Sequence, residues 1–448
     1  MKSTTLKQAA LGVALFLSGL THAQEPKPFG REIKRNNEGF VPCAATEYLS
    51  SLQTGGKRIS DAEFEQWLAP KVEAVRRQKS QKNSNQTVTL PVVVHVIHNG
   101  DEIGTNENLS DERVLSQIQV LNEDFGRIQE TPGYNEETPG VDTQIQFCLA
   151  QRDPDGNPTT GIEHIQMTRT SWNATAIETQ LKPQTIWDPE KYINIWVCNF
   201  GGDLVGVGGY AFFPEASGLE GLDEAESTAS GDGLTMYYKC FGSSAYAPEG
   251  EYISQIDMGR ATTHEMGHFF GLRHIWGDGE DCSATDYCDD TPAALAMNTT
   301  CGYIDSCTLD DKPDMVENYM DYTPDACKSV FTANQNERMW ATLNNALRRG
   351  TLITSDGCSA PTAGTNDNLL QGLNIYPNPV QDVLYIQSDI TGVDGSYEIY
   401  TVTGQAIAAK NIRFEDGLNI DTWTLSQGIY FVKLNRDGQT KTLKFIKQ

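Results

Sequence analysis

Three closely spaced histidines can bind one metal ion only if the backbone around them forms a helix and then turns back. His264, His268 and His274 lie within eleven residues of one another, in the stretch HEMGHFFGLRH. Residues four apart share one face of an α-helix, so His264 and His268 can direct ring nitrogens at a single metal ion. A straight helix cannot bring His274 to that ion. Gly271 can take a positive φ, end the helix and turn the chain back, so the sequence predicts a three-histidine site with one open position.

The chemistry of this site favours zinc and a catalytic role. Three neutral imidazoles with a fourth position left for water are typical of catalytic zinc, whereas structural zinc has four protein ligands. Glu265 follows the first histidine and can act on a water at that ion as a general base. A lone His-Glu-x-x-His pattern can fall by accident on an ordinary core helix. The added glycine and third histidine make the metal site the better interpretation.

A methionine and a tyrosine downstream complete the predicted site, within the stretch NYMDY at 318–322. Met320 in a tight turn under the zinc would give the ligands a soft apolar floor. Tyr322 can place its hydroxyl near the metal and donate a hydrogen bond to a developing oxyanion. Taken alone, Met320 is better explained as an ordinary core residue, and the alternative for Tyr322 is a half-buried loop residue.

Charge and hydropathy divide the chain into segments. Residues 1–23 have a basic start, an apolar run too short to span a bilayer and a small-residue end, which predicts a secretory signal peptide, with a membrane anchor as the alternative. No other apolar run is long enough for a transmembrane segment. Residues 24–82 carry a net charge of +3 and residues 83–364 one of −29, so the first can dock on the second as a propeptide. The total charge of −26 disfavours nucleic acid as a partner. We predict a propeptide at 24–86, a catalytic domain at 87–355, a linker at 356–369 and a C-terminal domain at 370–448.

Hydrophobic patterns predict an α/β catalytic domain. A continuous β-branched run at 90–97 predicts a buried strand, and 193–198 and 209–213 are predicted as further strands. Ser110 can cap one helix, and the capping box of Thr332 and Gln335 can start a last one. Short β-like runs in the C-terminal domain predict a small β-sandwich, with strands at 373–376, 383–387, 397–402, 428–434 and 441–446. The helix positions expected to be buried are Val114, Ile118, Leu121 and Phe125, and later Met339, Leu343 and Leu347.

These motifs resemble those of a known family. HEMGHFFGLRH followed by NYMDY is similar to the zinc site and Met-turn of the metzincin metallopeptidases. The stretches FCLAQRDPDGNPTTGI, YINIWVCNFGG, GGYAFFP and MDYTPDACKSVFTANQNERM narrow the resemblance to the pappalysin family, over about residues 88 to 349. It implies an α/β (α+β) zinc endopeptidase with a mixed sheet and a zinc helix. Zinc would lie on His264, His268 and His274, with Glu265 as general base and Tyr322 as a mobile tyrosine.

The same resemblance implies a latent precursor. The stretch FVPCAATEY at 40–48 is similar to the part of family zymogens in which a cysteine blocks the zinc, a role that falls here to Cys43. A thiolate is a strong zinc ligand and would displace the catalytic water. Relatives carry Cys-Gly-Thr, whereas Ala44 and Ala45 follow Cys43 here. A disulfide partner is the alternative role for Cys43.

The resemblance also implies cross-links and a second metal between the zinc helix and the Met-turn. The implied disulfides are Cys282–Cys307 and Cys301–Cys327, and the other cysteines stay unassigned. Carboxylates are frequent from Asp278 to Asp290, and hard oxygen ligands on a loop suit either solvation or calcium. The family favours structural calcium, with Asp278 and Asp290 as the preferred ligands.

The C-terminal domain has a resemblance of its own. LNIYPNPVQDVLYI, YEIYTVTGQAI and LSQGIYFVKLNRDGQTKTLKFIKQ are similar to the type IX (Por) secretion sorting domain, over about residues 370 to 448. This implies type IX secretion machinery as a partner and passage across the outer membrane. The protein would then be secreted, extracellular or attached to the outer cell surface.

The sequence therefore predicts a secreted zinc endopeptidase that acts on protein or peptide substrates. We expect the substrate to lie extended along an edge strand at 209–213. The alternative is a surface adhesin or binding protein with a structural zinc site, which would need a fourth protein ligand. Intact Glu265 disfavours an inhibitor-like pseudoenzyme. Cleavage specificity stays open, because Asp321 and Asp325 after the Met-turn are followed by Lys328.

Overall fold

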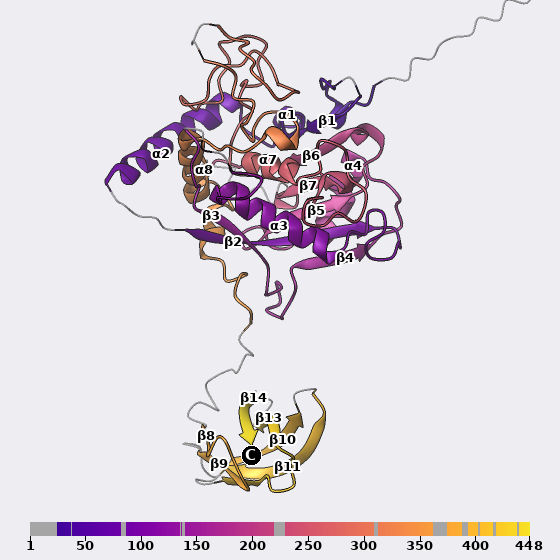
Figure 1. Ribbon diagram of the computed structural model, residues 1–448, viewed down its shortest axis with the longest axis vertical. Helices are drawn as coiled ribbons and strands as arrows, with labels where there is room; N and C mark the ends of the chain where they lie inside the picture. Colours follow the sequence, from indigo (N-terminus) through magenta and orange to yellow (C-terminus); the bar gives the residue numbers. More distant parts are fainter. Residues whose placement is uncertain are drawn as a thin grey trace, which may run out of the picture. The chain divides into compact units, whose positions relative to one another are not determined.

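The computed structural model divides the chain into two compact units, Met1–Ala360 and Pro361–Gln448 (Figure 1). The residues it describes are 25–36, 38–81, 87–134, 136, 139–218, 229–308, 312–361, 374–387, 393–401, 404–414, 418–436 and 439–448. The predicted signal peptide at 1–23, the propeptide junction at 82–86 and most of the predicted linker lie outside these residues. Within them, no helix has the length and apolar character needed to cross a membrane.

A mixed sheet around one long apolar strand forms the centre of the first unit. This strand, β2 (Val88–His98), contains the predicted run at 90–97 and is almost entirely buried. It pairs in parallel with β5 (Ile193–Cys198), which has the predicted bounds. The predicted mixed sheet is confirmed, because its other strands include one antiparallel pair, β6 with β7. The remaining strands are β3 (Ile145–Leu149), β4 (Ile162–Gln166), β6 (Val207–Ala211), β7 (Leu234–Tyr237) and β1 (Val41–Cys43), in the order β1-β6-β7-β5-β2-β3 with β4 also paired to β2.

Three helices pack on one face of this sheet. They are α3 (Asp111–Gly126), α7 (Arg260–Phe269) and α8 (Ala333–Asn345), and they share a single apolar core with β2. Ser110 accepts a hydrogen bond from the Arg113 amide, and the Thr332–Gln335 capping box is formed, as predicted. The burial predicted for Leu347 is wrong. The chain is already extended at Ala346, so Leu347 lies beyond α8 and is only half-buried.

The other face is covered by a helical stretch, α4 (Ala174–Ala176), the π-helical turn η2 (Ile177–Leu181) and α5 (Lys182–Thr185). Ile177 and Leu181 form a second apolar cluster there with Trp196 of β5. Short 3₁₀ turns complete the unit at Pro28–Gly30 (η1), Gly202–Leu204 (η3), Tyr238–Cys240 (η4), Asp325–Cys327 (η5) and Gly350–Thr354 (η6).

The predicted propeptide is folded onto the catalytic part of the unit. Its strand β1 pairs in parallel with β6, placing Cys43 opposite Gly209. Two helices follow, α1 (Ala45–Thr54) and α2 (Asp61–Gln81), and α2 lies along α8 (Figure 1). The edge strand at which we expect substrate is therefore covered by β1 in this form.

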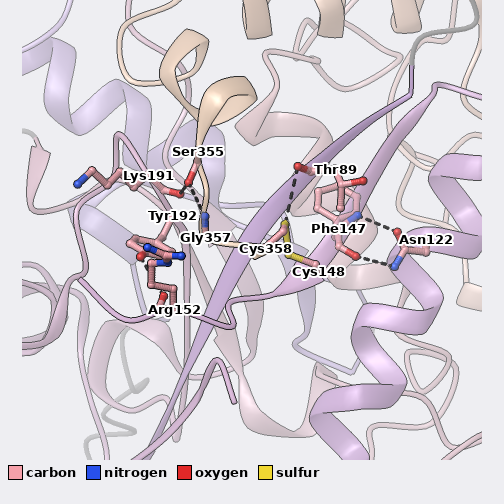
Figure 2. The surroundings of a disulfide bond; sticks show 10 residues. All are labelled: Thr89, Asn122, Phe147, Cys148, Arg152, Lys191, Tyr192, Ser355, Gly357 and Cys358. Carbon is pink, nitrogen blue, oxygen red and sulfur yellow. Dashed lines mark hydrogen bonds between the residues drawn. A yellow bond between two sulfur atoms is a disulfide. The ribbon is translucent and has the colours of Figure 1, made fainter. Parts of the chain in front are cut away.

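A disulfide ties the end of the first unit to the sheet. Cys148 of β3 is bonded to Cys358 (Figure 2). Beside it, the Gln151 amide donates to the Gly357 carbonyl at 2.8 Å, and the Ser355 hydroxyl donates to the Lys191 carbonyl at 2.7 Å. Both cysteines were unassigned from the sequence. Residues 356–360, which fall in the predicted linker, thus belong to the first unit.

Loss of this disulfide should lower stability strongly. The two cysteines are 210 residues apart in the sequence, and closing so long a loop restricts the unfolded chain by about 5 kcal/mol in the chain-entropy model. We expect the double variant Cys148→Ser/Cys358→Ser to unfold at a clearly lower denaturant concentration than the parent under oxidising conditions. With both proteins reduced the difference should vanish, and an equal midpoint before reduction would contradict the prediction.

The second unit consists of two small antiparallel sheets. The predicted runs at 383–387 and 428–434 correspond to β9 (Val383–Gln387) and β13 (Gly428–Arg436). Val380, Leu384, Ile399 and Val432 are buried between the sheets. The prediction of an all-β domain is confirmed, although Leu373 and Val402 lie outside the described residues. The other strands are β8 (Asn374–Tyr376), β10 (Val393–Thr401), β11 (Ala406–Phe414), β12 (Leu418–Asp421) and β14 (Gln439–Lys447), in sheets ordered β11-β10-β13-β14 and β12-β9-β8.

Candidate active site

The helix α7 carries the histidine motif and is anchored at its start by a distant aspartate. Gly259 precedes the helix with φ 83° and offers no side chain as a cap. Asp325 takes that role, since its Oδ2 accepts from the amides of Met258 at 2.9 Å and Arg260 at 3.1 Å. A carboxylate at a helix N-terminus also interacts favourably with the helix dipole. Sequence reasoning missed this role of Asp325.

Glycine is required at two positions of the motif, for a different structural reason at each. Gly271 has φ 87°, and a Cβ there would meet the Thr342 hydroxyl at 2.7 Å, so the turn after α7 requires glycine on both counts. This is the turn predicted to return the third histidine. Gly267 lies against the sulfur of Met320, where a Cβ would collide. Met320 is fully buried and packs under α7, which is the position predicted for the Met-turn.

The three histidine side chains converge. Nε2 of His268 lies 3.1 Å from Nε2 of His264 and 3.1 Å from Nε2 of His274. One ligand atom from each of these residues and from Cys43 lies within 4.8 Å of the others, and all four residues are buried. Two nitrogens bound about 2 Å from one tetrahedral ion are separated by about 3.3 Å. The cluster therefore fits a zinc ion.

Each imidazole is oriented by an acceptor at its other nitrogen. Nδ1 of His264 lies 2.7 Å from the Tyr319 carbonyl, and Nδ1 of His268 lies 2.8 Å from the Leu272 carbonyl. Nδ1 of His274 lies 2.6 Å from Oδ1 of Asp278. These acceptors place the proton on Nδ1 and leave the Nε2 lone pairs for a metal. Burial lowers the pKa of His268 to about 3, with His274 adding to the effect, so the ring stays neutral.

Glu265 is buried in the same site, and the nearest hydrogen-bonding groups to its carboxylate are the Cys43 thiol and the Ala211 backbone. Neither carboxylate oxygen forms a hydrogen bond of normal geometry with the described residues. Burial raises the pKa of Glu265 to about 8. A buried carboxylate with so few hydrogen bonds beside converging imidazoles is a costly arrangement for the fold alone, and it fits a group that exchanges a proton with a bound water.

Cys43 and Tyr322 meet at this site. The Cys43 thiol is buried, and its Sγ accepts from the Ala45 amide at 3.2 Å. The Tyr322 hydroxyl donates to the Cys43 carbonyl at 3.1 Å, and its ring lies 4.9 Å from that of His274. Cys43 is not in a disulfide, which was the alternative role for it.

The acidic loop after α7 is cross-linked by the two implied disulfides, Cys282–Cys307 and Cys301–Cys327. Both predicted calcium ligands have protein partners. Asp278 bonds to His274, as described above, and Asp290 accepts from the Thr332 hydroxyl at 2.7 Å and the Asn334 amide at 2.9 Å at the start of α8. The contact between His274 and Asp278 was not predicted from the sequence, where Asp278 was assigned to calcium.

The charged residues considered for specificity are all buried. Asp321 accepts from the amide and the side chain of Asn298, at 2.9 and 2.8 Å. Asp325 caps α7, and Lys328 is 2% exposed. Neither acid is presented to a substrate in this form.

Loss of the Asp278 carboxylate should weaken metal binding. Removing the partner of a ligating imidazole typically costs 10- to 100-fold in metal affinity. We expect Asp278→Asn to lower zinc affinity by about that factor in a competition titration with a chelator. Asp281→Asn, on the same loop but bonded only locally to Ser283, is the matched control and should bind zinc like the parent. Equal affinities for the two variants would contradict the prediction.

The mixed sheet, the zinc helix and the Met-turn define a metallopeptidase of the metzincin class. Residues 177–344 match the family model described as pregnancy-associated plasma protein-A. Residues 374–448 match the model of the secretion system C-terminal sorting domain. The chain belongs to the first of these families, the pappalysins, and is a secreted or cell-surface metalloendopeptidase made as a precursor.

Known relatives and solved structures agree with this assignment. An extracellular metalloprotease of Pyricularia oryzae is 31% identical over 254 residues, covering 56% of this chain and 74% of that protein. Mature mirolysin of Tannerella forsythia in complex with a cleaved peptide is 37% identical, with a TM-score of 0.51, covering 60% of this chain and 96% of that one. A promirolysin mutant from Tannerella forsythia is 31% identical, with a TM-score of 0.54, and covers 69% and 97%.

Proposed function

We propose that His264, His268 and His274 hold the catalytic zinc of this peptidase and that Glu265 is its general base. The observation that carries this assignment is the convergence of three Nε2 atoms beside a buried carboxylate that forms no hydrogen bond of normal geometry with the described residues. Bound zinc would supply Lewis-acid chemistry by polarising a carbonyl and lowering the pKa of a water. Glu265 accepts a proton from the attacking water and passes it to the leaving nitrogen of the peptide bond.

Cys43 closes the site in the precursor. Its sulfur would be the fourth ligand, which turns an open site into a closed one without room for the attacking water. Support comes from its free thiol, its burial and its place within 4.8 Å of the histidine nitrogens. Removal of the propeptide then opens the fourth position.

The Tyr322 hydroxyl has a different hydrogen-bond acceptor in the precursor and in the processed enzyme. In the precursor its hydroxyl donates to the Cys43 carbonyl at 3.1 Å. When Cys43 leaves, the same hydroxyl is free to donate to the oxyanion of a substrate at that place.

The substrate takes the place of β1 at the edge strand β6. A free strand edge pairs with an extended peptide through main-chain hydrogen bonds. In the precursor, Val41 and Ala44 donate their amides to the carbonyls of Gly206 and Gly209, so this edge already accepts an extended segment. A cavity of about 490 Å³ next to His274, Trp276 and Tyr322 adjoins the site.

Hydrolysis of casein by the processed chain, with zinc removed and restored, tests the proposal. A zinc-selective chelator should abolish cleavage, and stoichiometric zinc should restore it. If the processed chain binds zinc tightly but never cleaves a protein or peptide, the alternative of an adhesin with a structural zinc is favoured instead.

Calcium and the type IX machinery complete the proposal. Calcium in the acidic loop is supported by the density of carboxylates from Asp278 to Asp290. Addition of calcium to the calcium-free protein should raise its melting temperature, and magnesium at the same concentration should not.

Export through the type IX machinery is supported by the sorting-domain match, and deletion of residues 374–448 should retain the protein inside the outer membrane.

A further inference from the structure

Two arginines of the catalytic part enclose a carboxylate of the predicted propeptide. Arg338 of α8 donates from Nη1 to Oε2 of Glu65 at 2.6 Å and from Nη2 to Oε1 at 2.5 Å. Arg273 donates from Nε to the same Oε1 at 2.8 Å. All three residues are at least nine-tenths buried. Two guanidinium groups around one carboxylate form a charge-assisted, bidentate site.

Arg338 is also held by the catalytic part, whereas Arg273 makes a second ion pair with the predicted propeptide, from Nη1 to Asp61 at 3.2 Å. Nε of Arg338 donates to the Gly271 carbonyl at 2.7 Å, in the turn that returns the third histidine. Arg273 precedes His274 directly, and both guanidinium groups lie within 6 Å of the Tyr287 ring. Nη2 of Arg273 is buried and has no acceptor among the described residues, so the site has capacity for another oxygen.

Removal of the propeptide would leave this site without its carboxylate. The paired charges of Arg273 and Arg338 would then face solvent beyond the end of β6, where the rings of Phe64 of α2 and Phe213 now meet edge to face, with centroids 5.3 Å apart. A preformed pair of guanidinium groups binds carboxylates in preference to neutral amides.

We propose that Arg273 and Arg338 form a carboxylate-binding site of the processed enzyme, which takes an acidic side chain of a peptide. This inference rests on one part of the proposed function, the removal of the propeptide by cleavage near residue 86. The carboxylate comes either from the released propeptide, through Glu65, or from an acidic residue of a substrate. The site is separate from the metal ligands, and it would contact an acidic side chain of the peptide away from the zinc.

Binding of a short peptide tests the site without altering the arginines. The probe is the acetylated and amidated peptide of residues 61–69, titrated calorimetrically into Glu265→Ala enzyme that an added protease has processed. We expect it to bind at least about tenfold more tightly than the Glu65→Gln form of the same peptide, because only the carboxylate forms charge-assisted bonds. The Glu63→Gln peptide is the matched control, since Glu63 is exposed and bonds only to Ser60. It should bind like the parent peptide.

Two further measurements identify the source of the carboxylate. The first is gel filtration after cleavage. If the cleaved propeptide stays on the enzyme, and this retention is lost in full-length Glu65→Gln but not in Glu63→Gln, the propeptide is the source of the carboxylate. The second is the kcat/KM of peptide substrates. If kcat/KM is higher for substrates with Glu than for those with Gln, and the 61–69 peptide suppresses this difference, the substrate is the source of the carboxylate. Equal affinity of the parent peptide and its Glu65→Gln form would overturn the site. A processed chain that binds the peptide but cleaves nothing would contradict the proposed function and leave the site supported.

Discussion

Replacement of Glu265 by alanine should reduce peptide hydrolysis by about 10²- to 10⁴-fold, the usual contribution of a general acid–base group. The processed variant should still bind zinc with normal stoichiometry, because the three imidazoles keep their own acceptors at Nδ1. Turnover of a reporter peptide and metal analysis of the same sample measure the two effects separately. A loss of activity with zinc retained assigns the proton transfer to this carboxylate.

Glu112→Ala is the matched control for this experiment. Glu112 is an exposed glutamate in the first turn of α3, outside the site. The control should keep the activity of the parent. Near-normal activity of Glu265→Ala would contradict its role as base, and loss of zinc from that variant would indicate a structural role.

Replacement of Cys43 by alanine should make the uncleaved precursor active. Without the thiol, the fourth position of the zinc is open to water, and turnover of a short reporter peptide should rise on the order of tenfold or more. Strand β1 still pairs with β6 in this variant, so long substrates should gain less than short ones. The measurement is turnover by full-length protein, with electrophoresis to show that no propeptide has been removed.

Cys198→Ala controls for the loss of a buried thiol. Cys198 is also free and buried, at the end of β5, and it is not part of the histidine cluster. We expect this variant to stay latent. A Cys43→Ala precursor as inactive as the parent would show that β1 and the helices of the propeptide block the site without the sulfur.

The elements that sequence reasoning predicted best are those whose signals are local. β2 and β5 are rich in apolar and β-branched residues, and the start of α8 is set by a capping box within four residues. The geometry of the histidine cluster follows in the same way from the helical spacing of His264 and His268 and from the positive φ of Gly271.

The parts that were missed depend on contacts between distant segments. Pro70 lies inside α2 and normally breaks a helix, but Phe64, Leu68 and Val75 bury one face of α2 against the catalytic part. The cap of α7 by Asp325 joins residues about 65 positions apart, and no local pattern encodes it. The same holds for the pairing of β1 with β6 and for the bond between Cys148 and Cys358.

The position of that last bond affects how the chain withstands pulling from its C-terminal side. Tension applied along the segment after Ala360 reaches Cys358 first and passes through sulfur into the central sheet, whose strands resist as a group. The 3₁₀ turn η6 and helix α8 precede this attachment in the sequence and are shielded from the load. The disulfide therefore separates α8 mechanically from whatever acts on the segment after Ala360, and it holds Cys358 to β3 whether or not that segment is present.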